Sequence, residues 1–172
     1  MKYRKFGASD WKASVVGFGV NGLPVKGLEI DEGRSIEMIR RAIDQGINFI
    51  DAGDRRYLSR YEQTIRIIDQ ALQEGYCDKV RVSVGLPVSS ISSAKDLNRC
   101  LNEDIKRLNR DKIDFYFLAG LDRITWPRVQ EMNLLNCLET AMADGRIDKA
   151  GFSFHDHFLF LRGIIEGYDL SL

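Results

Sequence analysis

The residues best suited to chemistry lie in one short stretch, where Asp51 is followed closely by Arg55, Arg56 and Tyr57. The mostly apolar residues 47–50 precede the aspartate, which is typical of a buried strand that ends in polar groups. In parallel α/β proteins, ligands bind and reactions occur at the carboxyl ends of the strands. A carboxylate and a phenol there could transfer a proton, and the arginines could bind an anion or form a solvated charge pair. The stretch therefore predicts a catalytic or ligand-binding site.

A second polar cluster, His155-Asp156-His157, offers imidazole and carboxylate groups that suit zinc or iron. Alternate residues of an extended strand would place both imidazoles on the same side. However, the cluster stands at a predicted strand-to-helix turn, where Asp156 is suited to cap a helix that begins near Phe158. We expect the structural role and no metal site.

The composition excludes several classes of function. The 25 basic and 25 acidic residues balance, so nothing indicates nucleic acid or an anionic membrane surface as a partner. No apolar run could span a bilayer, and the charged N-terminus lacks the apolar core of a signal peptide. The 3 scattered cysteines form no Cys-x-x-Cys pair, which favours reduced thiols over a disulfide framework. We expect a cytoplasmic protein.

The elements that would position these residues alternate between strands and helices. A hairpin is predicted at the start of the chain, with arms at residues 3–6 and 12–14. Apolar runs predict later strands that start near Val15, Ile47, Val80, Ile113 and Lys149. Helical patterns separate these strands, and most end at a glycine such as Gly46, which can adopt the left-handed conformation found after helices.

The helix starts also carry local signals. Asp31 is a suitable cap for the first helix, and Ser93 with Asp96 resembles a capping box. Trp126 and Pro127 are predicted to open one helix that continues to Gly145.

The predicted strand starts are 32, 33, 33 and 36 residues apart. One strand and one helix at this period are typical of a (β/α)8 barrel, in which eight units take about 250 residues. A doubly wound sheet would allow the same alternation. Residues 17–22 match the glycine spacing of a dinucleotide-binding loop, but no helix is predicted to begin there, so no helix dipole could meet a pyrophosphate.

Five strands cannot close a barrel that needs eight, and an open parallel sheet leaves its inner face and edges uncovered. The chain is therefore expected to be a truncated product, a subunit completed by a second copy or a partner chain, or a rearranged open sheet. We predict an α/β fold, an incomplete (β/α)8 TIM barrel of about five parallel strand–helix units after an N-terminal β-hairpin. Residues 1–172 are expected to form this single truncated domain.

The chain carries the motifs GINFID at 46–51, GYCDKV at 75–80, LP at 86–87, IDFYFL at 113–118 with GL at 120–121, and GFSFHD at 151–156. In their order and spacing, these motifs resemble the aldo-keto reductases, and most closely the branch whose longer members carry an iron–sulfur module after the barrel. The resemblance implies a (β/α)8 barrel and hydride transfer between NADP(H) and a carbonyl or alcohol.

The resemblance also implies a catalytic set of Asp, Tyr, Lys and usually His at the barrel mouth. The tyrosine would protonate the carbonyl oxygen, the lysine would lower the tyrosine pKa, and the aspartate would hold the lysine. Asp51 matches the aspartate. Tyr57 stands one place after the expected tyrosine position, which is Arg56 here, and Tyr61 is a second candidate.

Two members of the implied set are replaced in this sequence. The lysine position, just before residues 86–87, is Gly85, and the histidine position is Ala119. Asp51 therefore lacks its cation unless Arg55 or Arg56 folds back onto it. An arginine, with its planar guanidinium, is a poor substitute for lysine in lowering the pKa of a tyrosine.

The cofactor site implied by the resemblance is also incomplete. Gly19, Asn21 and Ser153 stand at positions that resemble the part of the family's site near the nicotinamide. By the resemblance, most contacts to the adenosine phosphate would come from the last strands of the barrel. The iron–sulfur cysteines of the longer relatives would lie further along the sequence. We expect NADP binding by this chain alone to be weak or absent.

Together these observations predict an aldo-keto-reductase-like protein with a degenerate site, a pseudoenzyme that acts as a binding or interaction module. It is expected to form a homo-oligomer or to be completed by a partner chain. The alternative is an NADP-dependent oxidoreductase that reduces a carbonyl with Asp51 and Tyr57 while another copy or a partner supplies the missing strands.

Overall fold

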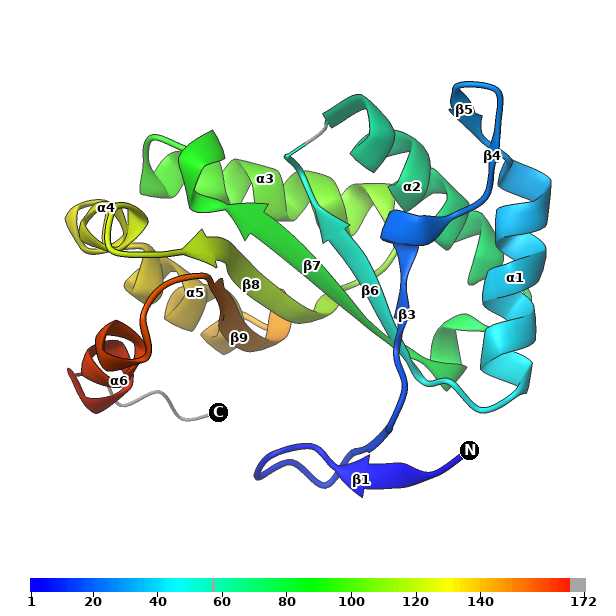
Figure 1. The fold of residues 1–172 in the computed structure, drawn as a ribbon, viewed down its shortest axis with the longest axis horizontal. Helices are drawn as coiled ribbons and strands as arrows, with labels where there is room; N and C mark the ends of the chain where they lie inside the picture. The colour runs from blue at the N-terminus through cyan, green and yellow to red at the C-terminus, as the bar shows by residue number, and fades with distance from the viewer. Residues whose placement is uncertain (57, 168–172) are drawn as a thin grey trace.

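The computed structural model describes residues 1–56 and 58–167 (Figure 1), so Tyr57 and residues 168–172 lie outside the described part. A parallel sheet forms its centre, and its strands follow the order β3-β6-β7-β8-β9. These strands are β3 (Phe18–Gly19), β6 (Phe49–Asp54), β7 (Arg81–Pro87), β8 (Ile113–Leu121) and β9 (Ile147–Phe154). Because strands that follow one another in the chain are neighbours in the sheet, this is an arc of a (β/α) barrel.

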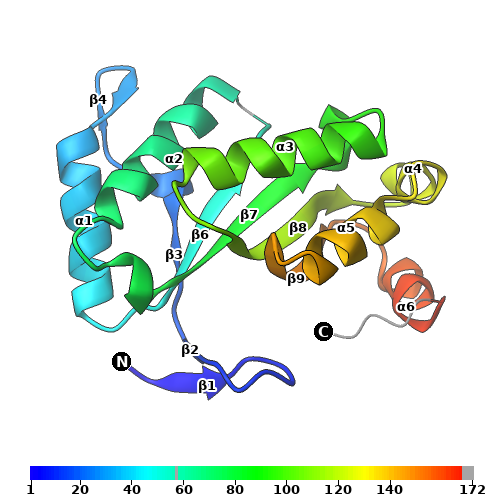
Figure 2. The same ribbon diagram turned by 180° about the vertical axis from the view of Figure 1, so that it is seen from behind.

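Helices cover one face of the sheet and leave the other face open, as the two opposite views show (Figures 1 and 2). The helices are α1 (Glu32–Asp44), α2 (Leu58–Ala71), α3 (Ala94–Arg107), α4 (Thr125–Glu131), α5 (Leu134–Ala143) and α6 (Phe158–Gly167). The predicted α/β fold, five parallel strand–helix units after a hairpin, is confirmed. No helix in the described ranges combines the length and the apolar character that a bilayer span requires.

The N-terminal hairpin pairs β1 (Tyr3–Lys5) with β2 (Lys12–Ser14) and lies at the amino end of the sheet (Figure 1). Asn48, just before β6, holds it in place. Its Oδ1 accepts from the Ser14 backbone N–H at 2.8 Å, and its Nδ2 donates to the Lys12 carbonyl at 2.8 Å. The Tyr3 hydroxyl donates to the Gly46 carbonyl at 2.9 Å. Gly46 has φ +94°, and a Cβ there would stand 2.7 Å from that hydroxyl, so both backbone and space demand glycine.

Two predicted helix caps are confirmed. An Asp31 carboxylate oxygen accepts from the Arg34 backbone N–H at 3.1 Å, which satisfies a free donor at the start of α1. At the start of α3, the Ser93 hydroxyl accepts from the Asp96 N–H at 3.2 Å and also donates to the Asp96 carboxylate at 3.1 Å. These contacts lie within four residues, which is why sequence alone indicates them.

The single helix predicted from Trp126 to Gly145 is wrong. Asn133 adopts the left-handed conformation, with φ +52° and ψ +42°, and so separates α4 from α5. The strand predicted from Val15 is also shorter than expected. Only Phe18 and Gly19 pair with β6, and Val15 and Val16 are exposed.

One further short strand pair and three turns complete the described elements. β4 (Val25–Lys26) pairs with β5 (Glu29–Ile30), and the turns are η1 (Val20–Gly22), η2 (Cys77–Lys79) and η3 (Val88–Ser90). Since a short turn rather than an α-helix follows Gly19, the rejection of a dinucleotide loop at residues 17–22 agrees with the backbone.

The hydrophobic core lies between the sheet and its helices. Alternate residues of the strands, such as Ile50, Val82 and Leu118, point toward this layer and are essentially inaccessible to solvent. Leu97 and Leu101 of α3 meet them from the other side and are equally buried. The opposite residues of each strand face the uncovered side of the sheet.

Candidate functional site

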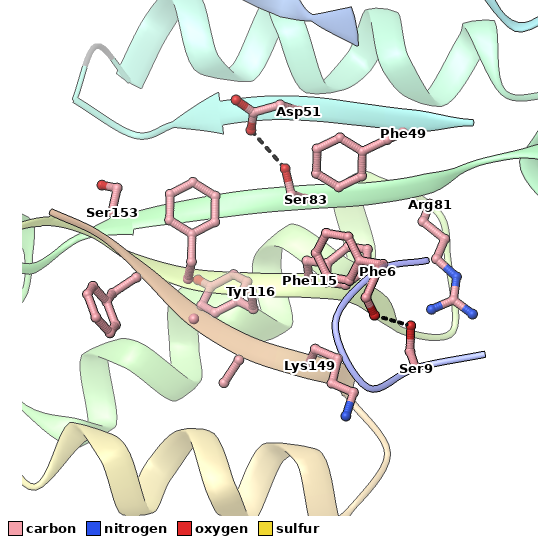
Figure 3. A pocket seen from close by; sticks show the side chains of 14 residues that line it. Phe6, Ser9, Phe49, Asp51, Arg81, Ser83, Phe115, Tyr116, Lys149 and Ser153 are labelled. Carbon is pink, nitrogen blue, oxygen red and sulfur yellow. Dashed lines mark hydrogen bonds between the residues drawn. The ribbon is translucent and has the colours of Figure 1, made fainter. Parts of the chain in front are cut away.

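The uncovered face of the sheet carries a cavity of about 370 Å³ (Figure 3). Its lining comes from strands β6, β7, β8 and β9 and from the tip of the hairpin. The lining residues are Phe6, Ser9, Phe49, Asp51, Arg81, Ser83, Phe115, Tyr116, Phe117, Lys149, Ala150, Gly151, Phe152 and Ser153. The cavity is therefore largely aromatic, with a few polar groups among the rings.

Asp51 is the third of the six residues of β6 and lies in register with Gly19 and Ser83. Its Oδ1 accepts from the Ser83 hydroxyl at 2.9 Å and from the Gly53 backbone N–H at 3.2 Å (Figure 3). The side chain is half-buried. The described partners of this carboxylate are thus a hydroxyl and an amide, which hold it in place without a counter-charge.

Arg55 does not fold back onto Asp51. Its guanidinium instead passes to the helix side of the sheet and donates to the buried carboxylate of Asp104 through Nε at 3.1 Å and Nη2 at 2.9 Å. The same Nη2 donates to Glu103 at 3.0 Å. Since only 7% of the Arg55 side chain is exposed, the expectation of a solvated loop charge is wrong for this residue. Arg56 is exposed and pairs with Asp54.

Asp104 is the centre of a buried polar network that the sequence analysis missed. Its Oδ1 also accepts from the Tyr61 hydroxyl at 2.9 Å, and its Oδ2 accepts from the Tyr116 hydroxyl at 3.2 Å. Asp104 stands seven residues after Leu97 on the same face of α3, among otherwise apolar residues. A carboxylate on an apolar helical face signals a buried partner, and that signal was available in the sequence.

The network shifts the pKa values of its members. Burial alone would lower the pKa of Arg55, but attraction to Asp104 and the hydrogen bond that Arg55 donates to Glu103 raise it above its ordinary value. Burial, followed by the negative charge of Asp104, raises the pKa of Tyr61. Tyr61 is 3% exposed, and its hydroxyl donates a hydrogen bond to Asp104. A phenol held in this way is a poor proton donor to a substrate at the sheet mouth.

The position where the family resemblance expects lysine is filled from the neighbouring strand. Gly85 of β7 lies in register with Phe117 of β8. A Cβ at position 85 would stand 2.7 Å from Cζ and 2.8 Å from Cε2 of the Phe117 ring, and 3.1 Å from the Asp54 Cβ. No side chain fits there unless the ring moves, because real Cβ atoms do not approach other heavy atoms so closely.

Ala119, at the expected histidine position, is 5% exposed and lies in register with Pro87. Its methyl group can neither donate nor accept a hydrogen bond. Tyr57, the predicted general acid, lies outside the described residues.

The three predicted cofactor residues all lie near the carboxyl end of the sheet but not together. Gly19 ends β3 beside Asp51, and nothing stands within 4 Å of a Cβ placed on it. Asn21 follows in the turn η1, where its Oδ1 approaches Gly53. Ser153 lies on β9 at the opposite edge of the sheet, and its hydroxyl accepts from the Gly120 N–H at 2.9 Å.

The His155-Asp156-His157 cluster is tied to the loop after β8. Asp156 accepts from the Arg123 N–H at 2.9 Å and from its Nε at 2.8 Å, and the side-chain bond from Arg123 holds the Asp156 pKa below its usual range. The cap predicted for Asp156 is wrong, since the His157 carbonyl accepts from Leu161 at 3.2 Å at the start of α6. Among residues 1–56 and 58–167, no three metal-ligating side chains converge.

Comparison with known proteins gives a consistent picture. The sequence profile of the aldo/keto reductase family matches residues 15–159. A thermostable aldo-keto reductase solved with the inhibitor epalrestat is 20% identical, with a TM-score of 0.79 over 100% of this chain and 60% of that one. The holo form of an aldo-keto reductase from Bacillus halodurans is 20% identical, with a TM-score of 0.75 over 95% of this chain and 54% of that one.

An aldo-keto reductase from Klebsiella pneumoniae, solved with NADPH, is 19% identical to the chain. Its TM-score is 0.67 over 82% of this chain and 45% of that one. The chain therefore spans about half the length of the solved structures that it resembles.

Proposed function

Since the chain belongs to the aldo/keto reductase family, a family of NADP-dependent oxidoreductases, we propose that it is a binding protein that has kept the fold but lost hydride-transfer chemistry. The observation that carries this proposal is the contact between Phe117 and Gly85. A phenyl ring stands where the family resemblance expects the side chain of a lysine to begin. The ring supplies no charge, so nothing there can lower the pKa of a nearby phenol.

The remaining groups at the sheet mouth support the same proposal. Asp51 is engaged by the Ser83 hydroxyl and the Gly53 N–H, and Arg55 is committed to Asp104 on the other side of the sheet. The methyl of Ala119 cannot orient a carbonyl oxygen. A general acid contributes about 10²- to 10⁴-fold to a rate only when its pKa is tuned and its geometry is fixed. The described residues provide neither condition.

The residues present also do not fit a tightly held nicotinamide cofactor. Gly19 and Ser153 stand on opposite edges of an open sheet, and the Ser153 hydroxyl already accepts a hydrogen bond from the backbone. NADPH is bound in the Klebsiella structure, which is about twice as long as this chain. For this chain alone we propose weak or absent NADP binding and derive no hydride step.

The second candidate is an NADP-dependent carbonyl reductase completed by another copy or a partner chain. Its support is Asp51, which stands at the expected position beside the open space at Gly19. In this case Tyr57 would be the general acid. The two uncovered strand edges make a homo-oligomer or a completing partner part of either candidate.

Cofactor titration combined with turnover separates the two candidates. NADPH fluorescence is followed as protein is added, and oxidation of NADPH at 340 nm is followed with 4-nitrobenzaldehyde as the carbonyl. The binding role predicts no saturable fluorescence change and no rate above the buffer. Turnover that saturates with aldehyde and disappears in Tyr57→Phe, but persists in the surface control Lys95→Gln, would establish the reductase instead.

A further inference from the structure

The cavity on the inner face of the sheet is lined by two kinds of polar group (Figure 3). Asp51 and Ser83 bond to each other, and Ser153 accepts from the backbone. Arg81 and Lys149, in contrast, form no side-chain hydrogen bond or ion pair with any residue that the structure describes. Lys149 lies in the same register row as Asp51 and Ser83, and Arg81 lies two residues nearer the amino end of β7. The first group is thus satisfied, whereas the two cations lack an anion.

The two cations flank one aromatic residue. Lys149 of β9 lies in register with Phe115 of β8, which in turn pairs with Ser83 of β7, two residues after Arg81. Neighbouring strands are about 4.8 Å apart and each residue advances about 3.3 Å along a strand, so the backbones at Arg81 and Lys149 are about 12 Å apart. Lysine and arginine side chains are long enough to bridge that span from both sides. A single anionic group above Phe115 can therefore meet both of them.

The wall around these two cations is aromatic. Phe6 of the hairpin lies 5.0 Å from Phe115, measured between ring centroids, and Phe49 lies 5.6 Å from Phe115. The guanidinium of Arg81 lies 4.8 Å from the centre of the Trp11 ring, which restrains the arginine without neutralising it. This wall offers apolar contact to a flat ring, and the restrained guanidinium offers a planar fork to a carboxylate.

The charge of the surrounding chain agrees with an anionic ligand. The hairpin that borders the amino end carries Lys2, Arg4, Lys5 and Lys12 against one acid, Asp10. On β9, the acid beside Lys149 is Asp148, which already pairs with Lys112. The whole chain is neutral, so this end is a local concentration of positive charge.

We propose that the inner face of the sheet binds a small planar aromatic carboxylate, with its ring against Phe49 and Phe115 and its carboxylate on Arg81 and Lys149. A cavity of about 370 Å³ lies within the range of small-molecule sites. Bidentate pairing of arginine with a carboxylate gives orientation as well as affinity. This inference rests on the proposed binding role, for which it names the ligand class.

Naphthalene-2-carboxylate tests the site without any cofactor, and its neutral analogue naphthalene-2-carboxamide is the matched probe. Isothermal titration is expected to show saturable binding of the carboxylate with one site per chain. The amide is expected to bind at least about tenfold more weakly, since a charge-assisted hydrogen bond is stronger than a neutral one. Lys149→Gln and Arg81→Gln are each expected to weaken the carboxylate about tenfold and to leave the amide unchanged.

The controls make the test decisive. Lys149 is exposed and unpaired within the described ranges, so Lys149→Gln should leave the circular dichroism spectrum unchanged even if Arg81→Gln disturbs the contact with Trp11. Lys95→Gln removes an exposed cation from α3, away from the cavity, and should bind like the parent protein.

The inference is overturned if the carboxylate does not saturate, if the amide binds equally well, or if Lys149→Gln binds like the parent. A stable dimer in light scattering that excludes the probe would also overturn it, because a second copy would then cover this face. The turnover assay with NADPH answers a different question. Reductase activity would refute the loss of catalysis, whereas the titration alone decides whether the anion site exists.

Discussion

Arg55 and Asp104 are 49 residues apart in the sequence, yet their side chains meet at 2.9 Å beneath the sheet. Arg55 belongs to the loop that follows β6, and Asp104 belongs to α3. The pair therefore fastens the loop of the candidate site to a helix of the core. The hydroxyls of Tyr61 and Tyr116 complete the bonding of the carboxylate, which makes its burial tolerable.

Removal of this guanidinium is the first prediction. Arg55→Gln leaves the buried Asp104 without its counter-charge and is expected to lower the free energy of unfolding by about 3–5 kcal/mol at neutral pH. Urea denaturation measures the loss. The exposed pair of Arg66 with Glu32 provides the control, and Arg66→Gln should cost less than about 0.5 kcal/mol.

The same variant should show a distinctive dependence on pH. Burial raises the folded-state pKa of Asp104 above its unfolded value of about 3.9 even beside Arg55, and loss of Arg55 should raise it further. A raised carboxyl pKa makes the folded state favour the protonated form. The loss in free energy of unfolding of Arg55→Gln, relative to the parent protein, should therefore become smaller as pH falls through the folded pKa toward about 4. A deficit that stays constant between pH 7 and pH 4 would show that lost packing, rather than an unpaired charge, causes it.

The contact between Gly85 and Phe117 gives the second prediction. Gly85→Ala is expected to destabilise the protein by about 1–3 kcal/mol, because the new methyl group overlaps the ring. In a Phe117→Ala background the same change should cost little, and the double-mutant cycle measures the coupling between the two sites. Gly33→Ala is the control, since nothing stands within 4 Å of a Cβ there. Equal costs in both backgrounds would refute the steric origin.

The third prediction concerns Asp96 at the start of α3. Hydrogen bonds from the Ser92 backbone and hydroxyl, and then from Ser93, lower its pKa to about 2. Ser92→Ala removes one of these donors and should raise the Asp96 pKa toward its ordinary value, as carbon-detected NMR titration would measure. The pKa of Asp122, which Thr125 lowers, should not change in this variant.

The sign of the associated stability follows from the depressed pKa. The ionised Asp96 contributes stability above the unfolded pKa of about 3.9, and that contribution is lost as pH falls toward the folded value of about 2. In Ser92→Ala, the stability that is lost as pH falls should therefore be smaller. The dependence of the free energy of unfolding on pH between pH 6 and pH 8 should not change.

The fourth prediction concerns the anchor of the hairpin. Asn48→Ala removes two side-chain hydrogen bonds of 2.8 Å to Ser14 and Lys12 and should cost about 1–3 kcal/mol. Tyr3→Phe removes one exposed hydrogen bond to Gly46 and should cost about 0.5–1.5 kcal/mol. Amide hydrogen exchange should increase in residues 3–14 of Asn48→Ala before it increases in the sheet. Uniform loss of protection would place Asn48 within the global folding unit instead.

Much of the fold could be predicted because its signals are local. The caps at Asp31 and Ser93 depend on residues within four positions, and Gly46 ends a helix through its own backbone freedom. The break at Asn133 could not be foreseen, since an asparagine in the left-handed conformation has the same neighbours in sequence as one inside a helix. Tertiary packing decides between the two.

The candidate site was predictable only in part. Asp51 was predicted to follow a strand at residues 47–50, but β6 begins at Phe49 and continues to Asp54, so Asp51 lies within the strand. The direction of Arg55 depends on an acid on a helix two units later, and the role of Gly85 depends on the register between β7 and β8. Neither relationship is visible until the strands are aligned. Tyr57 and its role as a general acid stay predictions.

The ring of Phe117 over Gly85 also determines which side chains position 85 accepts. A lysine at position 85 collides with the ring, and a smaller residue at position 117 leaves a cavity beside a bare glycine. The introduction of a lysine at position 85 thus requires two substitutions, and either one made alone costs stability. The two positions are therefore constrained jointly, so a single substitution does not place a lysine there without strain.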